Sequence, residues 1–379
     1  MASRVFLHVG VPKSGTTFLQ HGLWSQADRW RRLGVLLPAV GHREHRWGSL
    51  VVREDTRRLS ERPPAAARAW EEILADVHAW DGTAVVSHEF YGGATRAQAR
   101  RAVESLAADE VHVVVTARHP LQTLVSGWQE MTKYGRTVAL DDFCTGVSDD
   151  PHDVWNWRAL DAAEVLGHWG AVVPPERVHV VPVASSGQDA SLWVRFAGLL
   201  AADPPPYPDG GNASNASIGL VECEALRQVG AHLRDLASLP RSTWVRRYLA
   251  ETVLARRPAE RFWPGPDRIA ECRERGERVL AQVREAGYDV VGDLSHLAVP
   301  AQLPPRRSPA DVDPSEVAAV ATELVAELVR DLAAERRRAL AAERDAGARS
   351  TGDAGAGQPP GTPGRGLSGM VRRRLHRRA

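Results

Sequence analysis

A short glycine loop near the start of the sequence has the residue types that bind anions. The segment reads RVFLHVGVPKSGTTFLQ: an apolar run, Val5–Val9, leads into glycine, lysine, serine and threonine, and then into a helix-compatible stretch. Backbone N–H groups at the start of a helix carry partial positive charge and bind phosphate-like anions. The pattern predicts an anion cradle made by the amides of Ser14 to Thr17, with Lys13 at the crest of the loop.

The position of this lysine separates the loop from the nucleoside-triphosphate pattern GxxxxGK[ST]. In that pattern the lysine follows the second glycine and reaches the terminal phosphates, while the hydroxyl group binds magnesium. Gly10 and Gly15 have the required spacing, but Thr16 occupies the lysine position and Lys13 lies upstream of the second glycine. The loop therefore keeps an anion cradle without the usual arrangement of lysine and metal.

A second candidate anion site follows another apolar run, in the segment VHVVVTARHPLQTLVSGW. Arg118 lies at the end of this run, and Ser126 follows it in a helix-compatible stretch. A guanidinium binds a phosphate dianion through two parallel hydrogen bonds, and a serine hydroxyl adds an oriented donor. Because ligands of parallel α/β sheets bind at the carboxyl ends of strands, we expect both residues near the glycine loop.

A third set of polar residues, Ser87, His88 and Glu89, ends the apolar run in AVVSHEFYGG. Both the imidazole of His88 and the carboxylate of Glu89 can accept a proton from a hydroxyl group. Adjacent residues of a strand point to opposite faces, so we expect only one of the two to reach an acceptor molecule. A carboxylate needs burial or a hydrogen bond from that hydroxyl to act as a base near neutral pH.

The first two patterns together resemble the co-substrate site of sulfotransferases that use 3′-phosphoadenylyl sulfate (PAPS). PKSGTT, from Pro12 to Thr17, is similar to the 5′-phosphosulfate loop of that family, and the pair Arg118 and Ser126 is similar to its 3′-phosphate element. The resemblance implies that Lys13 stabilises the leaving phosphate and that no metal is needed. It also implies a 5′-phosphate cradle formed by Ser14, Gly15, Thr16 and Thr17.

The same resemblance extends to two weaker matches. The S-x-E-F pattern ending at Phe90 is similar to bacterial members with a glutamate base, which favours Glu89 over His88 as the general base. NASNASIG is similar to a segment that closes over the nucleotide, which implies contacts from Asn215 and Ser217. Either of these two residues could instead cap the helix expected from about Leu220.

The expected activity is transfer of a sulfuryl group from PAPS to a hydroxyl group, less readily an amine, of a carbohydrate, lipid or secondary metabolite. Transfer is direct and in-line, and adenosine 3′,5′-bisphosphate is the by-product. One alternative is a P-loop kinase that uses Mg-ATP, against which Thr16 argues. Another is a non-catalytic P-loop scaffold, which the presence of Lys13, Arg118, Ser126 and Glu89 disfavours.

The elements expected around these residues alternate between strand and helix. Nearly continuous apolar runs are typical of strands buried in a parallel sheet, and alternation with helices predicts a three-layer α/β/α fold. The resemblance makes this a P-loop-like sulfotransferase fold. Strands are expected at Val5–Val9, Ala84–Ser87, Val111–Thr116 and Val178–Val183, with a short one in GVLLP. Helices are expected at Thr17–Arg31, Ala65–Ala79, Arg96–Ala107, Leu121–Lys133, Asp161–Trp169 and Ala190–Leu200.

The C-terminal half is expected to add helices to this domain. They are predicted at Leu220–Leu236, Thr243–Arg256 and Asp267–Glu285, followed by a long amphipathic helix capped by Asp313. We expect a sulfotransferase domain at 1–300, the amphipathic helix at 301–346 and a disordered basic tail at 347–379. The acceptor is expected to bind to variable loops, including the segment Arg43 to Arg62.

Composition sets broad limits on the class of protein. The 379 residues are 43% hydrophobic and 25% charged, with a net charge of +1, so the sequence gives no support for nucleic-acid binding. We expect no membrane span and no secretion signal, and contact of the arginine-rich tail with anionic lipid is a minor alternative. His42 and His45 are expected on the surface. Three widely spaced cysteines, Cys144, Cys223 and Cys272, indicate a reducing, cytoplasmic location. The oligomeric state is left open.

Overall fold

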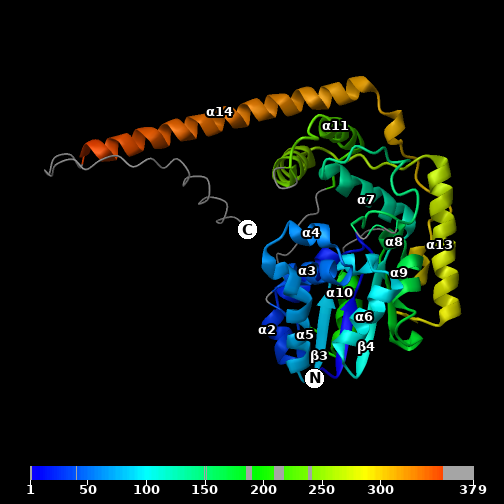
Figure 1. Ribbon diagram of the computed structural model, residues 1–379. Coiled ribbons are helices and arrows are strands. Elements are labelled where there is room, and N and C mark those ends of the chain that lie inside the picture. The colour runs from blue at the N-terminus through cyan, green and yellow to red at the C-terminus, as the bar shows by residue number, and fades with distance from the viewer. Residues whose placement is uncertain are drawn as a thin grey trace. The chain divides into compact units, whose positions relative to one another are not determined.

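The structure is a computed structural model in which two units are distinguished along the chain (Figure 1). The units are Met1–Ala321 and Thr322–Ala379. Most of the tail expected at 347–379 lies outside the described residues. Those residues are 2–39, 41–148, 150, 152–184, 190–208, 217–237 and 241–352, with side chains described up to 344.

Six parallel strands form one sheet in the order β2-β3-β1-β4-β5-β6, which confirms the predicted parallel α/β class. Five strands coincide with the apolar runs. The sixth, β6, was not predicted because it has only two residues, neither of them buried. The strands are β1 Arg4–His8, β2 Val35–Leu36, β3 Thr83–Ser87, β4 Glu110–Ala117, β5 Val178–Pro182 and β6 Asp289–Val290.

Helices occupy most of the remaining described chain, and most follow the predicted ranges. The α-helices are α1 Thr16–Trp24, α2 Ala27–Arg32, α3 His42–Val52, α4 Thr56–Ser60, α5 Ala69–Ala79, α6 Arg96–Leu106, α7 Pro120–Lys133, α8 Trp157–Leu160, α9 Ala162–Trp169, α10 Ala190–Leu200, α11 Leu220–Ala231, α13 Pro266–Ala286 and α14 Pro314–Gly352. A π-helix, η4, spans Ser242–Val253. Short 3-10 turns are η1 Pro64–Arg68, η2 Glu89–Gly93, η3 Pro175–Arg177, η5 Leu254–Arg256, η6 Leu294–Leu297 and η7 Pro309–Asp311.

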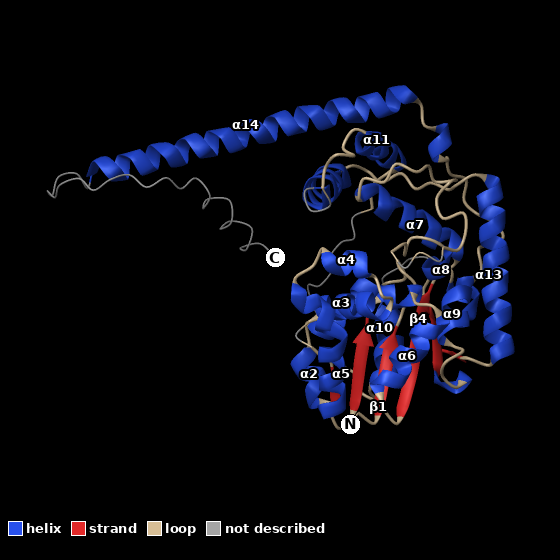
Figure 2. Ribbon diagram, in the orientation of Figure 1, coloured by secondary structure: helices blue, strands red, loops and turns tan. Residues whose placement is uncertain are grey.

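Helices cover both faces of the sheet, which gives the three-layer α/β/α arrangement (Figure 2). On one face, Leu7 and Val115 belong to a core with buried residues of α5, α6, α9 and α13. On the other, Phe6 and Val114 belong to a core with residues of α1, α2 and α10. Alternate side chains of each strand thus enter opposite cores, and this orients the polar residues at the strand ends.

Two predictions for the N-terminal third were wrong in detail. The single helix expected at Thr17–Arg31 is divided into α1 and α2, and the turn between them places Trp30 in the core against Trp193, with ring centroids 5.9 Å apart. The segment Arg43 to Arg62, expected as a variable loop, contains α3 and α4. Asp55 caps α4 by accepting a hydrogen bond from its backbone.

The long C-terminal helix begins where the sequence indicated. Asp313 caps α14, because its Oδ1 accepts a hydrogen bond from the N–H of Ser315 at 2.8 Å. Glu316 completes the cap, since its Oε2 accepts from the N–H of Asp313 at 2.9 Å. No helix of the described residues is long and apolar enough to cross a membrane. The three cysteines are buried free thiols.

One histidine prediction is overturned by burial. His42 is exposed, but His45 is completely buried, so the expectation of a surface position for His45 was wrong. Its Nε2 donates to the carbonyl of Pro38 at 2.7 Å, and its Nδ1 accepts from the N–H of Ser87 at 3.1 Å. The imidazole therefore ties α3 to the carboxyl end of β3.

Stability should fall in mild acid because three histidines are buried in the neutral form. Burial is the main cause that lowers the pKa of His8, His45 and His88 from 6.5 to about 4. In the unfolded chain each ring regains its ordinary pKa of 6.5, so the unfolded state binds more protons as the pH falls. The contribution of these neutral rings to the free energy of unfolding is complete above pH 6.5 and is lost as the pH falls toward 4. We expect urea midpoints to drop across that window.

A matched pair of variants isolates this effect from the titration of carboxylates. His45→Gln should lower the midpoint at neutral pH but weaken its dependence on pH, whereas His78→Gln, at an exposed position on α5, should preserve that dependence. A midpoint that stays constant between pH 6.5 and pH 4 in the unmodified protein would contradict the neutral burial of these rings.

Candidate functional site

The candidate residues gather where three neighbouring strands end. β3, β1 and β4 lie side by side, so their carboxyl ends share one edge of the sheet. From β1 the chain passes to β2 and β3 on one side and then to β4 on the other, so the direction of winding reverses at β1. Ligands of parallel α/β sheets bind outside the strand ends at such a reversal. Lys13, Glu89 and Arg118 follow these three strands in the sequence.

The glycine loop after β1 has a backbone conformation that few residues adopt. Gly10 and Gly15 have φ angles of +45° and +85°, in the left-handed region, and Lys13 shares this region with φ +68°. A Cβ atom at Gly10 would lie 2.8 Å from Cγ2 of Thr16, and one at Gly15 would lie 2.8 Å from Cδ2 of Leu192. Both glycines are thus required by conformation and by packing. A lysine held at positive φ is strained, as is common at functional sites.

The amides of the loop divide into two groups. The N–H of Ser14 donates to the carbonyl of Val11 at 3.2 Å, and the hydroxyl of Ser14 donates to the same carbonyl. The structure therefore turns both donors of Ser14 inward, away from the predicted cradle. Gly15, Thr16 and Thr17 follow at the start of α1, which has no side-chain cap, and their N–H groups have no acceptor within the described parts of the chain.

A buried chain of hydrogen bonds holds the loop to the strand ends, and its centre is His8, which the sequence analysis missed. Because the Ser14 hydroxyl donates to Val11, it must accept from the hydroxyl of Thr116, at 2.7 Å. Thr116 in turn accepts from Nε2 of His8 at 3.0 Å, and Nδ1 of His8 accepts from the Ser87 hydroxyl at 2.8 Å. The directions of these bonds require the neutral Nε2–H tautomer, which agrees with the lowered pKa of His8, about 4.

The ammonium group of Lys13 lies against α7. Its Nζ is 3.1 Å from Oε2 of Glu130, a carboxylate that is almost buried. Arg246, on η4, contacts Oε1 of the same carboxylate at 3.2 Å. Ser126 lies four residues before Glu130, and residues at this spacing share one face of a helix. The contact therefore places the loop lysine one helical turn from the predicted 3′-phosphate serine.

Arg118 is a half-buried cation without a counter-ion in the described chain. Its Nε atom is buried and has no hydrogen-bond partner among the described residues. Burial lowers the pKa of Arg118 to about 10, and no carboxylate offsets this effect. An uncompensated buried charge is strongly unfavourable, so this arrangement favours an anionic ligand at the junction of β4 and α7.

The closing segment is described only in part. Asn215 lies outside the described residues. Ser217 is exposed, and its hydroxyl donates to Oε1 of Gln129 on α7 at 3.4 Å. Gly219, not Ser217, is the N-cap of α11, and no side chain caps that helix. Ser217 therefore lies beside the α7 helix, and the capping alternative for this residue was wrong.

The turn η2, which carries Glu89, packs directly on the glycine loop. A Cβ atom at Gly92 would be 3.0 Å from the carbonyl oxygen of Gly10, so the two backbones are in close contact. Gln20, one turn into α1, approaches Oε2 of Glu89 with its amide at 3.4 Å. Burial raises the pKa of the Glu89 carboxyl, but His88, the backbone N–H of Glu89 and Gln20 together lower it below 4.5.

His88 has a different hydrogen-bonding state from its neighbour. Its Nδ1 accepts from the N–H of Phe90 at 3.1 Å, and burial is the main cause that lowers the pKa of His88 to about 4. At neutral pH the ring is therefore uncharged and carries its proton on Nε2. Glu89 is ionised under the same conditions and has a free lone pair, so it is the better proton acceptor of the two.

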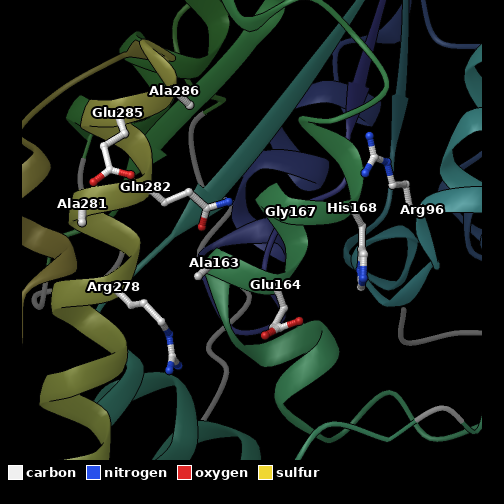
Figure 3. Close-up of a pocket in the computed structure, with 10 residues that line it drawn as sticks. All are labelled: Arg96, Ala163, Glu164, Gly167, His168, Arg278, Ala281, Gln282, Glu285 and Ala286. Carbon is white, nitrogen blue, oxygen red and sulfur yellow. The ribbon is translucent and has the colours of Figure 1, made fainter.

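The largest difference from expectation is a hollow that contains none of the candidate residues. It lies between α9 and α13, has a volume of about 910 Å³ and is lined by side chains of both charges, including Arg96, Glu164, Arg278 and Glu285 (Figure 3). By contrast, the contacts of Lys13 and Ser217 converge on α7.

No family model, curated protein or solved structure matches this chain.

Removal of the Glu130 carboxylate should strengthen anion binding at the loop. In the structure this carboxylate neutralises Lys13 and Arg246, and an incoming phosphate must compete with it. We expect Glu130→Gln to bind adenosine 3′,5′-bisphosphate about three- to tenfold more tightly in calorimetry. Glu251→Gln is the matched control, because Glu251 contacts Arg246 but forms no ion pair with Lys13 in the described chain. Weaker binding by Glu130→Gln would show that the carboxylate positions Lys13 and does not compete.

Proposed function

We propose that this chain is a sulfotransferase, which transfers a sulfuryl group from PAPS to a hydroxyl group, less readily an amine, of a carbohydrate, lipid or secondary metabolite. The proposal depends on the contact between Lys13 and Glu130. This contact brings the lysine of the glycine loop onto α7, the helix that contains Ser126 of the second motif. Ser126 lies one turn away on α7, and Arg118 lies just before the first turn of α7. The resemblance assigned these residues to two phosphates of a single co-substrate.

The donors present fit a ligand with two separate anionic groups. The unpaired amides of Gly15, Thr16 and Thr17, with Lys13 beside them, fit a 5′-phosphate. Arg118, half-buried and without a counter-ion in the described chain, fits a 3′-phosphate. PAPS has these two groups, supplies the sulfuryl group and leaves as adenosine 3′,5′-bisphosphate. The winding reversal at β1 is also the place where a P-loop-like fold of this kind would bind its nucleotide.

In the proposed reaction Glu89 accepts the proton of the acceptor hydroxyl as the new oxygen–sulfur bond forms. Lys13 donates to the phosphate oxygen whose bond to sulfur breaks, so that the developing negative charge is stabilised by an ammonium group that is already in place. The helix N-terminus adds its amides to the same oxygens. The His8 hydrogen bonds hold the loop, so the relative positions of base and ammonium depend on this buried chain.

Replacement of Lys13 should abolish turnover without unfolding the protein. We expect Lys13→Ala to lower the rate of PAPS consumption by about 10²–10³-fold, since one preorganised donor to the departing charge is lost. The melting temperature should change little, because Glu130 keeps its ion pair with Arg246 and the lost pair is partly exposed. Arg32→Ala, at an exposed position on α2, is the control for loss of a cation elsewhere. Magnesium-dependent turnover of ATP, with no turnover of PAPS, would support the kinase alternative instead.

Glu89 and His88 can be distinguished by their effects on rate and binding. We expect Glu89→Gln to reduce kcat by about 10²–10⁴-fold, because the proton acceptor is lost, while adenosine 3′,5′-bisphosphate still binds. His88→Gln should reduce kcat much less, because its Nε2 already carries a proton. A larger loss in His88→Gln than in Glu89→Gln would assign the base to the histidine.

A further inference from the structure

Four exposed or half-buried arginines come from α3, from α4 and from the segments that follow α4 and α7. Arg46 lies on α3, Arg58 on α4, Arg62 just after α4, and Arg136 just after α7. All except the half-buried Arg58 are exposed. Figure 1 shows α3 and α4 at the end of the sheet where the strands terminate. We call these four residues the arginine cluster.

The helix α3, which carries Arg46, is fixed close to Glu89 by contacts of the backbone and of a buried side chain. α3 packs on η2, the turn that carries Glu89. The buried His45, directly before Arg46 on α3, accepts a hydrogen bond from the N–H of Ser87 at 3.1 Å. Arg46 therefore projects from a helix that is tied to the residue two positions before the base.

The charges within this region act on one another. Although the side chain of Arg46 reaches the surface, partial loss of solvent around it lowers the pKa of its guanidinium group. Tyr134 and Glu89 oppose this shift, and Arg62 and Arg58 add to it. Burial also lowers the pKa of Arg58, and Arg136 adds to that effect. Arg46 is thus within electrostatic range of Arg58, Arg62 and Glu89, and Arg58 is within range of Arg136.

Within the described chain, the neighbouring carboxylate of Asp55 pairs with one member of this cluster, Arg58, and leaves the other three without an ion pair. Asp55 is completely buried and is already engaged by Arg53, Arg58 and His152. Arg46, Arg62 and Arg136 have no ion-pair partner in the described part of the chain. A local excess of positive charge attracts anions, and free guanidinium groups bind carboxylates and sulfates through two hydrogen bonds.

We propose that the sulfate acceptor is itself an anion: a hydroxyl compound with a carboxylate or sulfate group, which Arg46 and Arg62 bind while the hydroxyl group meets Glu89. This inference depends on the proposed function, because it assigns the second substrate of the same site. The co-substrate does not account for the arginine cluster, because its two phosphates are assigned to other groups. Lys13 and the α1 amides, after β1, are assigned to one phosphate, and Arg118, between β4 and α7, is assigned to the other. The net charge of +1 for the whole chain argues against a nucleic acid as the bound anion.

Pairs of acceptors that differ only in charge test this proposal. An unsulfated chondroitin hexasaccharide is compared with its carboxyl-reduced form, and 4-hydroxyphenylacetate with 4-hydroxyphenylacetamide. The two pairs distinguish a sugar acid from a phenolic acid as the source of the carboxylate. We expect kcat/KM for the charged member of at least one pair to exceed that for its neutral partner about tenfold or more.

Substitutions assign this preference to the arginine cluster. In the double variant Arg46→Gln, Arg62→Gln, the ratio of kcat/KM between charged and neutral acceptors should fall about tenfold. Arg32→Gln on α2 removes an exposed arginine away from the site and should preserve the ratio. Neutral acceptors used as well as their charged partners in both pairs would overturn the inference while leaving the sulfotransferase assignment intact.

Binding separates failure of this inference from failure of the proposed function. If no acceptor pair supports PAPS consumption, calorimetry with the hexasaccharide and with 4-hydroxyphenylacetate is performed in the presence of adenosine 3′,5′-bisphosphate. Binding of a charged probe that is lost in the double variant would support an anion site at the arginine cluster, even though the activity had to be reassigned. Equal binding by the unmodified protein and the double variant, or no binding of either charged probe, would overturn the inference.

Discussion

The candidate site depends on one buried chain of hydrogen bonds across three strands. The chain runs from Ser87 on β3 through His8 on β1 and Thr116 on β4 to Ser14 in the glycine loop. Each of these groups donates its hydrogen bond to the next one along the chain. Each polar group in the chain is buried, so loss of one partner would leave its neighbour unsatisfied, at a cost of about 1–3 kcal/mol. The strand ends and the loop therefore form one rigid unit, and the side chains attached to them keep their relative positions.

On this rigid base the charges are arranged unevenly. Cations come from the glycine loop, α3, the junction of β4 and α7, and η4, whereas the nearby carboxylates Glu130 and Asp55 are already paired. Glu89 differs from both, since no lysine or arginine forms an ion pair with it within the described chain. A carboxylate that is ionised but not neutralised is suited to accept a proton, and the surrounding cations are suited to hold anions on either side of it.

Local sequence patterns were sufficient for the sheet and for the loop, because both depend on neighbouring residues. The apolar runs became strands, and Gly10 and Gly15 adopt the left-handed conformations that a tight loop requires. The partners of the site residues were not predictable in this way. His8 meets Thr116 across 108 positions and Lys13 meets Glu130 across 117, and nothing in either segment indicates the other. A histidine within an apolar strand was the one signal that could have identified the buried chain.

The backbone of Lys13 has a consequence for how such a site persists. Its φ of +68° is unfavourable for any residue with a side chain, and glycine would relieve that strain. The substitution that relieves the backbone strain of the loop is therefore also the substitution that removes its ammonium group. An unstrained backbone and a positive charge therefore exclude each other at this one position of the loop.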